Sequence, residues 1–143
     1  MEPLDLTKHP PRSPSVRLAG LIMLPRTIDK LRASLPGGNV GPYYIRGFSA
    51  IMLEQLGIEE SALRDAVANA KTDDEVADWV RAHSDPSKYD EINAFLRKRR
   101  IADRVDDPDF MARYPSITAL SLPHEMPLID MLEHDDRFMF ESR

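Results

Sequence analysis

Arg17, Arg26 and Lys30, three cations near the start of the chain, have the types and spacing best suited to a chemical site. Arg26 and Lys30 are four residues apart, so on a helix they share one face. Guanidinium and ammonium groups bind carboxylates and phosphates. Asp29 follows Arg26 by three residues and could pair with it, which would reduce the repulsion between the cations. The spacing indicates either an anion site held by Arg26, with Arg17 or Lys30 assisting, or a solvated helix face with ordinary ion pairs.

Two phenols and a guanidinium, Tyr43, Tyr44 and Arg46, form a second group in a segment bounded by Gly41 and Gly47. A loop of this composition suits a pocket wall or a lid. We expect it to close over the anion, with Arg46 as a further ligand-binding residue. A tyrosine could also act as a general acid, so Tyr43 and Tyr44 are candidate catalytic residues. Alternatively, one ring packs in the core and the other lies on the surface.

His83 is the histidine of greatest interest, because it shares a predicted helix face with Val76 and Trp79. It is a candidate catalytic base, although a core or capping histidine near a helix end would explain the same position. None of the 4 histidines has a recognisable metal-ligand spacing, so we predict no metal site. The acidic stretch at residues 133–136, which contains a histidine, is interpreted as the end of a solvated helix rather than a weak metal site.

The basic run at residues 97–100 could bind nucleic acid or phosphate. It lies near the end of a predicted helix, however, where cations complement the helix dipole, and several aspartates follow it. The whole chain carries a formal net charge of −5, which argues against a dedicated nucleic-acid binder. The sequence contains no phosphate loop, dinucleotide fingerprint or nucleophile elbow. We therefore predict neither a nucleic-acid partner nor a cofactor.

The elements that must position these residues are predicted to be mainly helices. Leu24, Ile28, Leu31 and Leu35 form an apolar stripe at helical spacing. Similar stripes follow in five later segments, near residues 48–56, 62–70, 76–80, 89–96 and 127–132. Strand patterns are limited to residues 41–47 and to residues 15–24, and the apolar run in residues 15–24 could equally form a buried helix turn. The fold class is therefore mainly all-α: a compact bundle of about five or six short helices, with one small β-hairpin at most.

Length and composition indicate one domain behind a short arm. Residues 1–14 hold four of the 12 prolines and are expected to form an extended arm, either loose or laid over the domain, with residues 15–143 as a single helical domain. The longest apolar run, residues 18–24, is far shorter than the roughly 20 residues of a membrane helix. The start of the chain lacks a signal-peptide pattern, and cysteine is absent. We expect a cytoplasmic protein with no membrane partner.

The string RSPSVRLAGLIMLPRTIDKLRA at residues 12–33 resembles the opening signature of a bacterial family, domain-of-unknown-function family 5069. Ala19 and Gly20 stand where that pattern more often has a glycine pair. Residues 57–59, 74–79 and 129–132 are also similar, so the resemblance covers most of the chain after residue 11. It implies no substrate or reaction. It implies only that five residues belong to the characteristic motif: Arg12, Arg17, Arg26, Asp29 and Lys30.

Two functional hypotheses follow from these patterns. In the first, the domain holds an anionic small molecule in a pocket and could act on it by non-covalent acid/base chemistry. In the second, the chain is an interaction or regulatory module. Its arm and an exposed group in the last helix, Phe138, Met139 and Phe140, would then dock on another protein or on a second copy as a homodimer.

Overall fold

The computed structural model describes residues 1–141, and within that range the chain is built from eight α-helices and two short 3-10 helices, without a strand. The mainly all-α prediction is confirmed, with more helices than the five or six expected. The elements are α1 (Leu24–Ala33), α2 (Phe48–Leu56), α3 (Glu60–Asn69), α4 (Asp73–Ala82), η1 (Pro86–Lys88), α5 (Tyr89–Lys98), η2 (Ile101–Asp103), α6 (Pro108–Arg113), α7 (Ser116–Ala119) and α8 (Leu128–Glu141).

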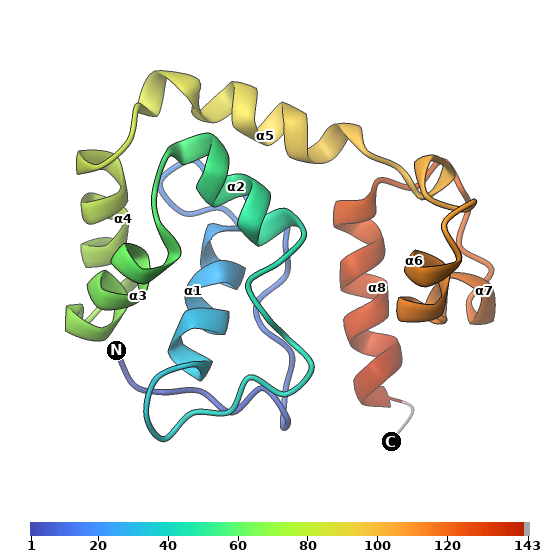
Figure 1. The fold of residues 1–143 in the computed structure, drawn as a ribbon, viewed down its shortest axis with the longest axis horizontal. Helices are drawn as coiled ribbons and strands as arrows, with labels where there is room; N and C mark the ends of the chain where they lie inside the picture. The colour runs from blue at the N-terminus through green and yellow to red at the C-terminus, as the bar shows by residue number, and fades with distance from the viewer. Residues whose placement is uncertain (142–143) are drawn as a thin grey trace.

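Helices α1 to α5 form a first group around a common core (Figure 1). The predicted apolar stripe forms α1, where Ile28 and Leu31 are fully buried. Helices α2 and α3 both pack against α1, α4 packs against α3, and α5 crosses over α2. Thr72 caps α4, because its hydroxyl accepts a hydrogen bond from the Glu75 amide at 3.3 Å. The Glu75 carboxylate, however, accepts from the Lys71 amide rather than completing the capping box.

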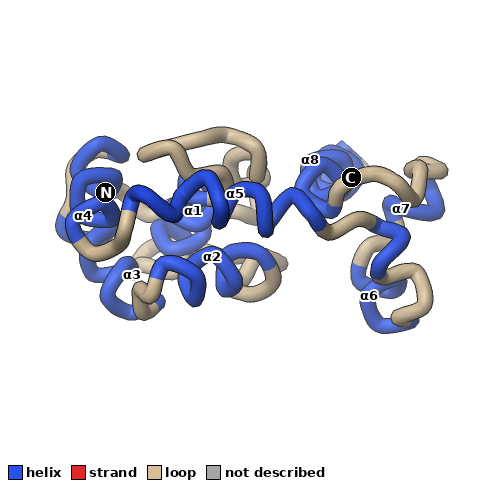
Figure 2. Tube along the Cα trace, turned by 90° about the horizontal axis from the view of Figure 1, so that it is seen from above, coloured by secondary structure: helices blue, strands red, loops and turns tan. Residues whose placement is uncertain are grey.

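Helices α6, α7 and α8 form a second group at the other end of α5 (Figure 2). Its core is a separate cluster that includes Ile101, Phe110 and Ile117. Apolar contacts help to join the groups: Ile129 of α8 is buried in the first core, and Phe48 of α2 packs against both cores. The seam between the groups is where the candidate site lies.

The proline-rich arm lies over the domain rather than loose in solvent. The N-terminal ammonium donates to the carbonyl of Val67 at 3.0 Å. The Leu6 amide donates to the carbonyl of Asn39 at 2.8 Å, and the Leu6 side chain is fully buried beside Ala33 and Tyr43. The arm therefore fixes the segment that follows α1.

The apolar run before α1 forms a tight turn, which is neither of the two predicted alternatives, a helix or a strand. Leu18 and Leu21 exchange backbone hydrogen bonds of 3.1 and 2.9 Å around Ala19 and Gly20. Both central residues have positive φ, 58° at Ala19 and 81° at Gly20, as the corresponding hairpin turn demands. Asn93 of α5 holds the turn, since its side-chain amide donates to the Gly20 carbonyl at 2.7 Å. The turn lets the apolar residues after it enter the core.

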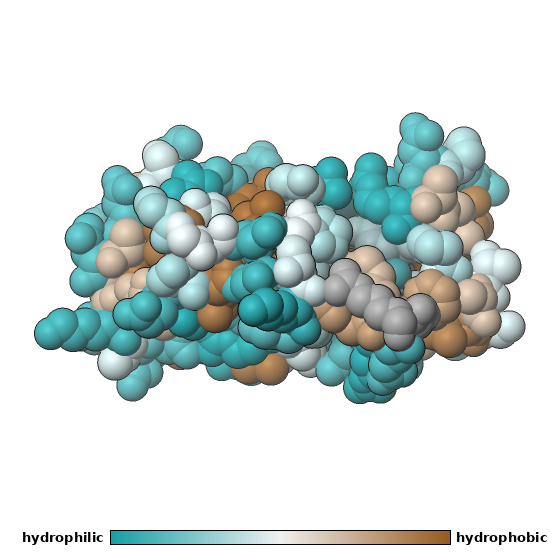
Figure 3. All heavy atoms as spheres, turned by 90° about the horizontal axis from the view of Figure 1, so that it is seen from below, coloured by the Kyte–Doolittle hydropathy of each residue, from teal (hydrophilic) through white to brown (hydrophobic). Residues whose placement is uncertain are grey.

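The surface offers no long apolar element in residues 1–141. Helix α8, with 14 residues, is the longest there, and no helix in that range has the length and apolarity to cross a bilayer. On the face drawn in Figure 3, hydrophobic residues form separate patches among hydrophilic ones. Phe138, Met139 and Phe140 are half-buried rather than exposed as expected, because Met139 and Phe140 pack toward the cluster around Leu6. Docking of α8 on a partner or a second copy stays a prediction.

Candidate functional site

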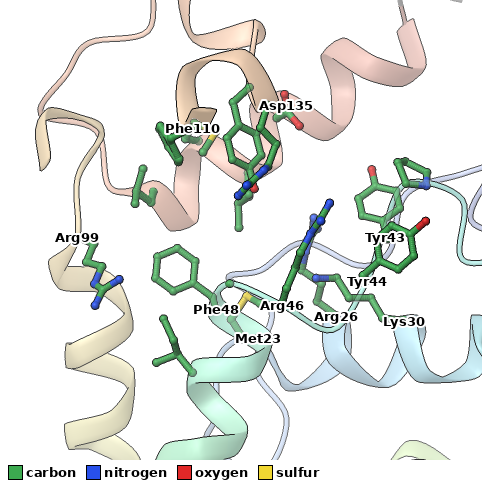
Figure 4. A pocket seen from close by; sticks show the side chains of 18 of the residues that line it. Met23, Arg26, Lys30, Tyr43, Tyr44, Arg46, Phe48, Arg99, Phe110 and Asp135 are labelled. Atoms are coloured by element: carbon green, nitrogen blue, oxygen red, sulfur yellow. The ribbon is translucent and has the colours of Figure 1, made fainter. Parts of the chain in front are cut away.

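A pocket of about 230 Å³ lies at the seam between the two helical groups. The first group contributes α1, the segment at residues 42–47, the start of α2 and Arg99 at the end of α5. The second group contributes Arg104, residues of α6 and one face of α8. Figure 4 shows Phe48 and Arg46 between these walls, with Phe110 and Asp135 on the side of the second group. The pocket therefore exists only where the two groups meet.

Basic side chains dominate the pocket lining. Asp135 is the one carboxylate among the lining residues that the structure describes. Arg104 pairs with Asp107 at 3.0 Å, and Arg26 pairs with Asp136 at 2.7 Å. The other four cations have no carboxylate within 4.0 Å anywhere in residues 1–141, in a chain whose net charge is −5. The six lining cations are Arg26, Lys30, Arg46, Arg99, Arg104 and Arg113.

Arg26, Tyr43 and Asp136 form an inner cluster at the base of this seam. Arg26 donates to both oxygens of Asp136, at 2.7 and 3.1 Å, and the Tyr43 hydroxyl donates to Asp136 Oδ1 at 2.9 Å. The Arg26 guanidinium also lies 5.4 Å from the centre of the Tyr43 ring. All three residues are buried. Burial and the neighbouring Asp136 raise the pKa of Tyr43, so its hydroxyl holds its proton and is a poor general acid.

Arg26 is thus largely occupied by the protein itself. Its two terminal nitrogens bind Asp136, and one of them also donates to the Arg12 carbonyl at 3.3 Å. Its Nε is buried and has no hydrogen-bond partner in residues 1–141. Arg26 therefore links α1 to α8, and Nε is its one side-chain nitrogen without a hydrogen-bond partner in residues 1–141.

Lys30 lies one turn beyond Arg26 on the same face of α1, as its spacing predicts. Its side chain is buried, with 8 % of the residue exposed, and within residues 1–141 Nζ donates only to Ser49 Oγ, at 3.4 Å. Burial, together with the positive charge of Arg26, lowers the pKa of Lys30 to about 7, although Asp136 opposes the shift. A large share of the Lys30 amine is therefore neutral at physiological pH.

Asp135 presents a carboxyl to the pocket from α8. It accepts a hydrogen bond from Ser116 Oγ at 2.7 Å. Burial raises the pKa of Asp135, and the neighbouring Asp136 adds to the increase. The interpretation of residues 133–136 as the end of a solvated helix is wrong for these two aspartates, because both are buried against the rest of the fold. Residues 1–141 contain no group of three or more acidic or histidine side chains able to hold a metal ion.

An outer cluster lies apart from the pocket and consists of Arg12, Asp29 and Asp73. Arg12 Nη2 contacts Asp29 at 3.0 Å, and Nη1 contacts Asp73 at 2.7 Å. The Arg12 amide also donates to Asp29 at 2.8 Å. The hydrogen bond from Arg12 lowers the pKa of Asp73 despite partial burial. This cluster ties the arm to α1 and α4, so Asp29 pairs with Arg12 and not with Arg26.

Residues 8–137 match the family model described as Domain of unknown function (DUF5069). The chain belongs to this family. A search of curated proteins finds no match. The resemblance found in residues 12–33 is thereby confirmed, and the family description assigns no activity, ligand or partner.

This DUF5069 domain brings five of the predicted site residues to the pocket, two on α1 and three on the loop before α2: Arg26, Lys30, Tyr43, Tyr44 and Arg46. Three others do not line it. Asp29 belongs to the outer cluster, and Arg17 lies exposed. His83 is exposed at the end of α4, stacked on Trp79 with ring centres 4.1 Å apart.

The pocket also contains residues of the DUF5069 domain that sequence reasoning did not select. Arg104, Arg113 and Asp135 come from the second helical group, which no motif had connected with α1. Arg99 lies in the basic run that was interpreted as the end of a helix. Among these four residues, only Arg99 belonged to a sequence pattern, the basic run, that had indicated possible phosphate binding. The other three positions look like ordinary surface charges in the sequence.

Proposed function

We propose that this domain binds an anionic small molecule in the pocket at the seam. The excess of basic side chains over carboxylates in the lining carries the proposal. Lys30, Arg46, Arg99 and Arg113 all lack a carboxylate partner among residues 1–141. Clustered cations next to apolar walls concentrate the local field and attract anions even where the net charge is negative. Arg46, Arg99 and Arg113 are exposed at the pocket and are the residues we expect to receive the charged groups.

The rest of the lining supports a ligand with a planar or apolar part. Tyr44, Phe48, Phe110 and Tyr114 provide aromatic surfaces in the pocket. The Arg46 guanidinium lies 5.1 Å from the centre of the Tyr44 ring, which leaves its edge free for a carboxylate or phosphate. A volume of about 230 Å³ suits a small metabolite better than a polymer.

Acid/base chemistry on such a ligand would depend on Asp135. Its raised pKa keeps the carboxyl protonated to higher pH than usual, as a general acid requires. Tyr43 is engaged with Asp136, and His83 lies outside the pocket. In the proposed function, Asp135 therefore replaces Tyr43 and His83 as the residue that would transfer a proton.

Thermal unfolding tests the proposal. The panel would contain inorganic phosphate, pyrophosphate, sugar phosphates, nucleotides and di- and tricarboxylates. An anion present at 100 times its dissociation constant adds about 2.7 kcal/mol to the free energy of unfolding, which raises the Tm by several degrees. We expect Arg46→Gln to lose most of that shift. Arg81→Gln is the matched control, because Arg81 is an exposed arginine of α4 outside the pocket lining. The proposal fails if no anion raises the Tm, or if Arg46→Gln and Arg81→Gln respond alike.

A further inference from the structure

Lys30 differs in its surroundings from the other lysines of the chain. Lys8, Lys71, Lys88 and Lys98 are exposed, whereas Lys30 is buried and lines the pocket. A buried ammonium is normally paired with a carboxylate. Lys30 has no such partner within 4.0 Å in the described chain, and its one hydrogen bond goes to a serine hydroxyl.

The charged groups around Lys30 explain why its amine is not held as an ammonium ion. Arg26 on the same helix and Arg46 on the loop before α2 both repel a positive charge there. Asp136 of α8 attracts it, but that carboxylate already receives hydrogen bonds from Arg26 and Tyr43. Burial and two cations thus outweigh one shared anion, and the pKa of Lys30 falls to about 7. An amine of this kind has a free lone pair at neutral pH and can act as a nucleophile.

We propose that Lys30 forms an imine with an aldehyde or ketone that carries an anionic group and enters the pocket. The inference rests on the proposed function, because the pocket arginines must hold the anionic group while the carbonyl approaches Nζ. The lone pair of Nζ attacks the carbonyl carbon, and one amine proton moves to the oxygen. The resulting carbinolamine then loses water, which leaves a carbon–nitrogen double bond. Neither an oxidant nor a reductant is needed.

Pyridoxal 5′-phosphate is the probe, because it combines an aldehyde, a phosphate and a planar ring. The full-length protein is incubated with the probe and sodium cyanoborohydride, which reduces an imine to a stable secondary amine. Intact mass and peptide mapping then locate the adduct. We expect the peptide that contains Lys30 to be modified first, at least tenfold faster than the exposed lysines. Modification spread evenly over all lysines would overturn the proposal.

Two variants and a pH series provide the controls. Lys30→Met should lose the fast adduct, whereas Lys98→Met, which changes an exposed lysine outside the pocket lining, should retain it. In the wild-type protein the trapping rate should rise with pH and level off just above pH 7, because the neutral amine is the reactive form. A rate that continues to rise toward pH 10 would indicate an ordinary exposed lysine. This pH series does not depend on the folding of any variant.

Pyridoxine 5′-phosphate, which has an alcohol in place of the aldehyde, separates the two proposals. If it raises the Tm and competes with the aldehyde at Lys30, both the anion site and the imine are supported. If it raises the Tm but the aldehyde gives no preferential Lys30 adduct, the imine is wrong and the anion site stands. If neither this compound nor any anion of the panel raises the Tm, the anion site is wrong, and the imine proposal that rests on it is wrong as well.

Discussion

The outer and inner clusters both pair an arginine of the family motif with aspartates, but they differ in how deeply the arginine is buried. The Arg12 side chain is 35 % exposed and pairs with Asp29 and Asp73, whose side chains are 6 % and 34 % exposed. The Arg26 side chain is 3 % exposed, and Asp136 is the one carboxylate that it pairs with in residues 1–141. A partly exposed ion pair contributes modestly, because water competes for the exposed charge. A buried pair is costly to break, because the remaining charge stays without a partner in the interior. The same residue types therefore fasten an arm in one place and join two helical groups in the other.

The largest effect should come from breaking the inner cluster. Arg26→Met leaves the Asp136 carboxylate buried beside Tyr43, and we expect a loss of about 3–5 kcal/mol in the free energy of unfolding, measured by urea denaturation. The double variant Arg26→Met with Asp136→Leu removes both charges and should recover most of the loss. If Arg26→Met costs no more than Arg12→Met, burial is not what distinguishes the clusters.

Lys30 sharpens the comparison, because it is buried like Arg26 but forms no ion pair with a carboxylate in residues 1–141. Its pKa is about 7 in the folded protein and 10.5 in an unfolded chain. Between these values the unfolded chain binds more protons, so the free energy of unfolding rises with pH. We expect the stability of the wild-type protein to increase relative to Lys30→Met by about 2–4 kcal/mol between pH 7 and pH 10. A difference that does not change with pH would show that Lys30 is hydrated in the folded state.

A smaller effect is expected at the outer cluster. Arg12→Met removes charge-assisted hydrogen bonds to Asp29 and Asp73 and should cost about 1–2 kcal/mol at pH 7. Asp73 has a lowered pKa in the folded state, so its contribution is present above pH 4 and is lost as the pH falls through the folded pKa. The difference in the free energy of unfolding between the wild-type protein and Arg12→Met should therefore become smaller below about pH 4. Chemical denaturation of both proteins at pH 7 and pH 3 measures this difference. A larger difference at pH 3 than at pH 7 would contradict the assigned role of Asp73.

The smallest effect concerns the turn that separates the two arginines in the sequence. Ala19 has φ 58°, a left-handed conformation that costs a residue with a Cβ about 1–2 kcal/mol and glycine almost nothing. Glycine is more flexible in the unfolded chain, which offsets part of the gain. We expect Ala19→Gly to raise the free energy of unfolding by about 0.5 kcal/mol, visible as a Tm increase of a degree or two. A decrease would mean that Ala19 makes packing contacts worth more than the relief of strain.

The sequence was sufficient for contacts within one helix and insufficient for contacts between distant segments. The apolar stripe of α1 and the shared face of Arg26 and Lys30 follow from helical periodicity, and both appear in the structure. The partner of Arg26 could not be found in this way, because Asp136 lies 110 residues further along the chain. Periodicity gives the face of a helix but does not say which other helix covers it.

The turn at residues 18–21 could not be predicted from the sequence, for a different reason. Its apolar residues have neither the period of a helix nor that of a strand, so the pattern left both open. Positive φ at Ala19 was not predictable, because alanine rarely adopts it. The glycine pair that is more usual in the related pattern was the available clue, since a two-residue turn of this type requires left-handed conformation at both positions.

The distance in sequence between Arg26 and Asp136 also governs the order of events during synthesis. The ribosome completes α1 long before it reaches α8, since 110 residues separate the two side chains. Until α8 emerges, the Arg26 guanidinium has no partner that would allow it to leave water. The first five helices can collapse around their own core, but their face toward α8 must stay hydrated. We expect a chain arrested before residue 128 to be cut by protease near α1, and the complete chain to resist. A ligand that contacts both helical groups would then stabilise the state in which α8 is docked on the first group, which is the last step of folding.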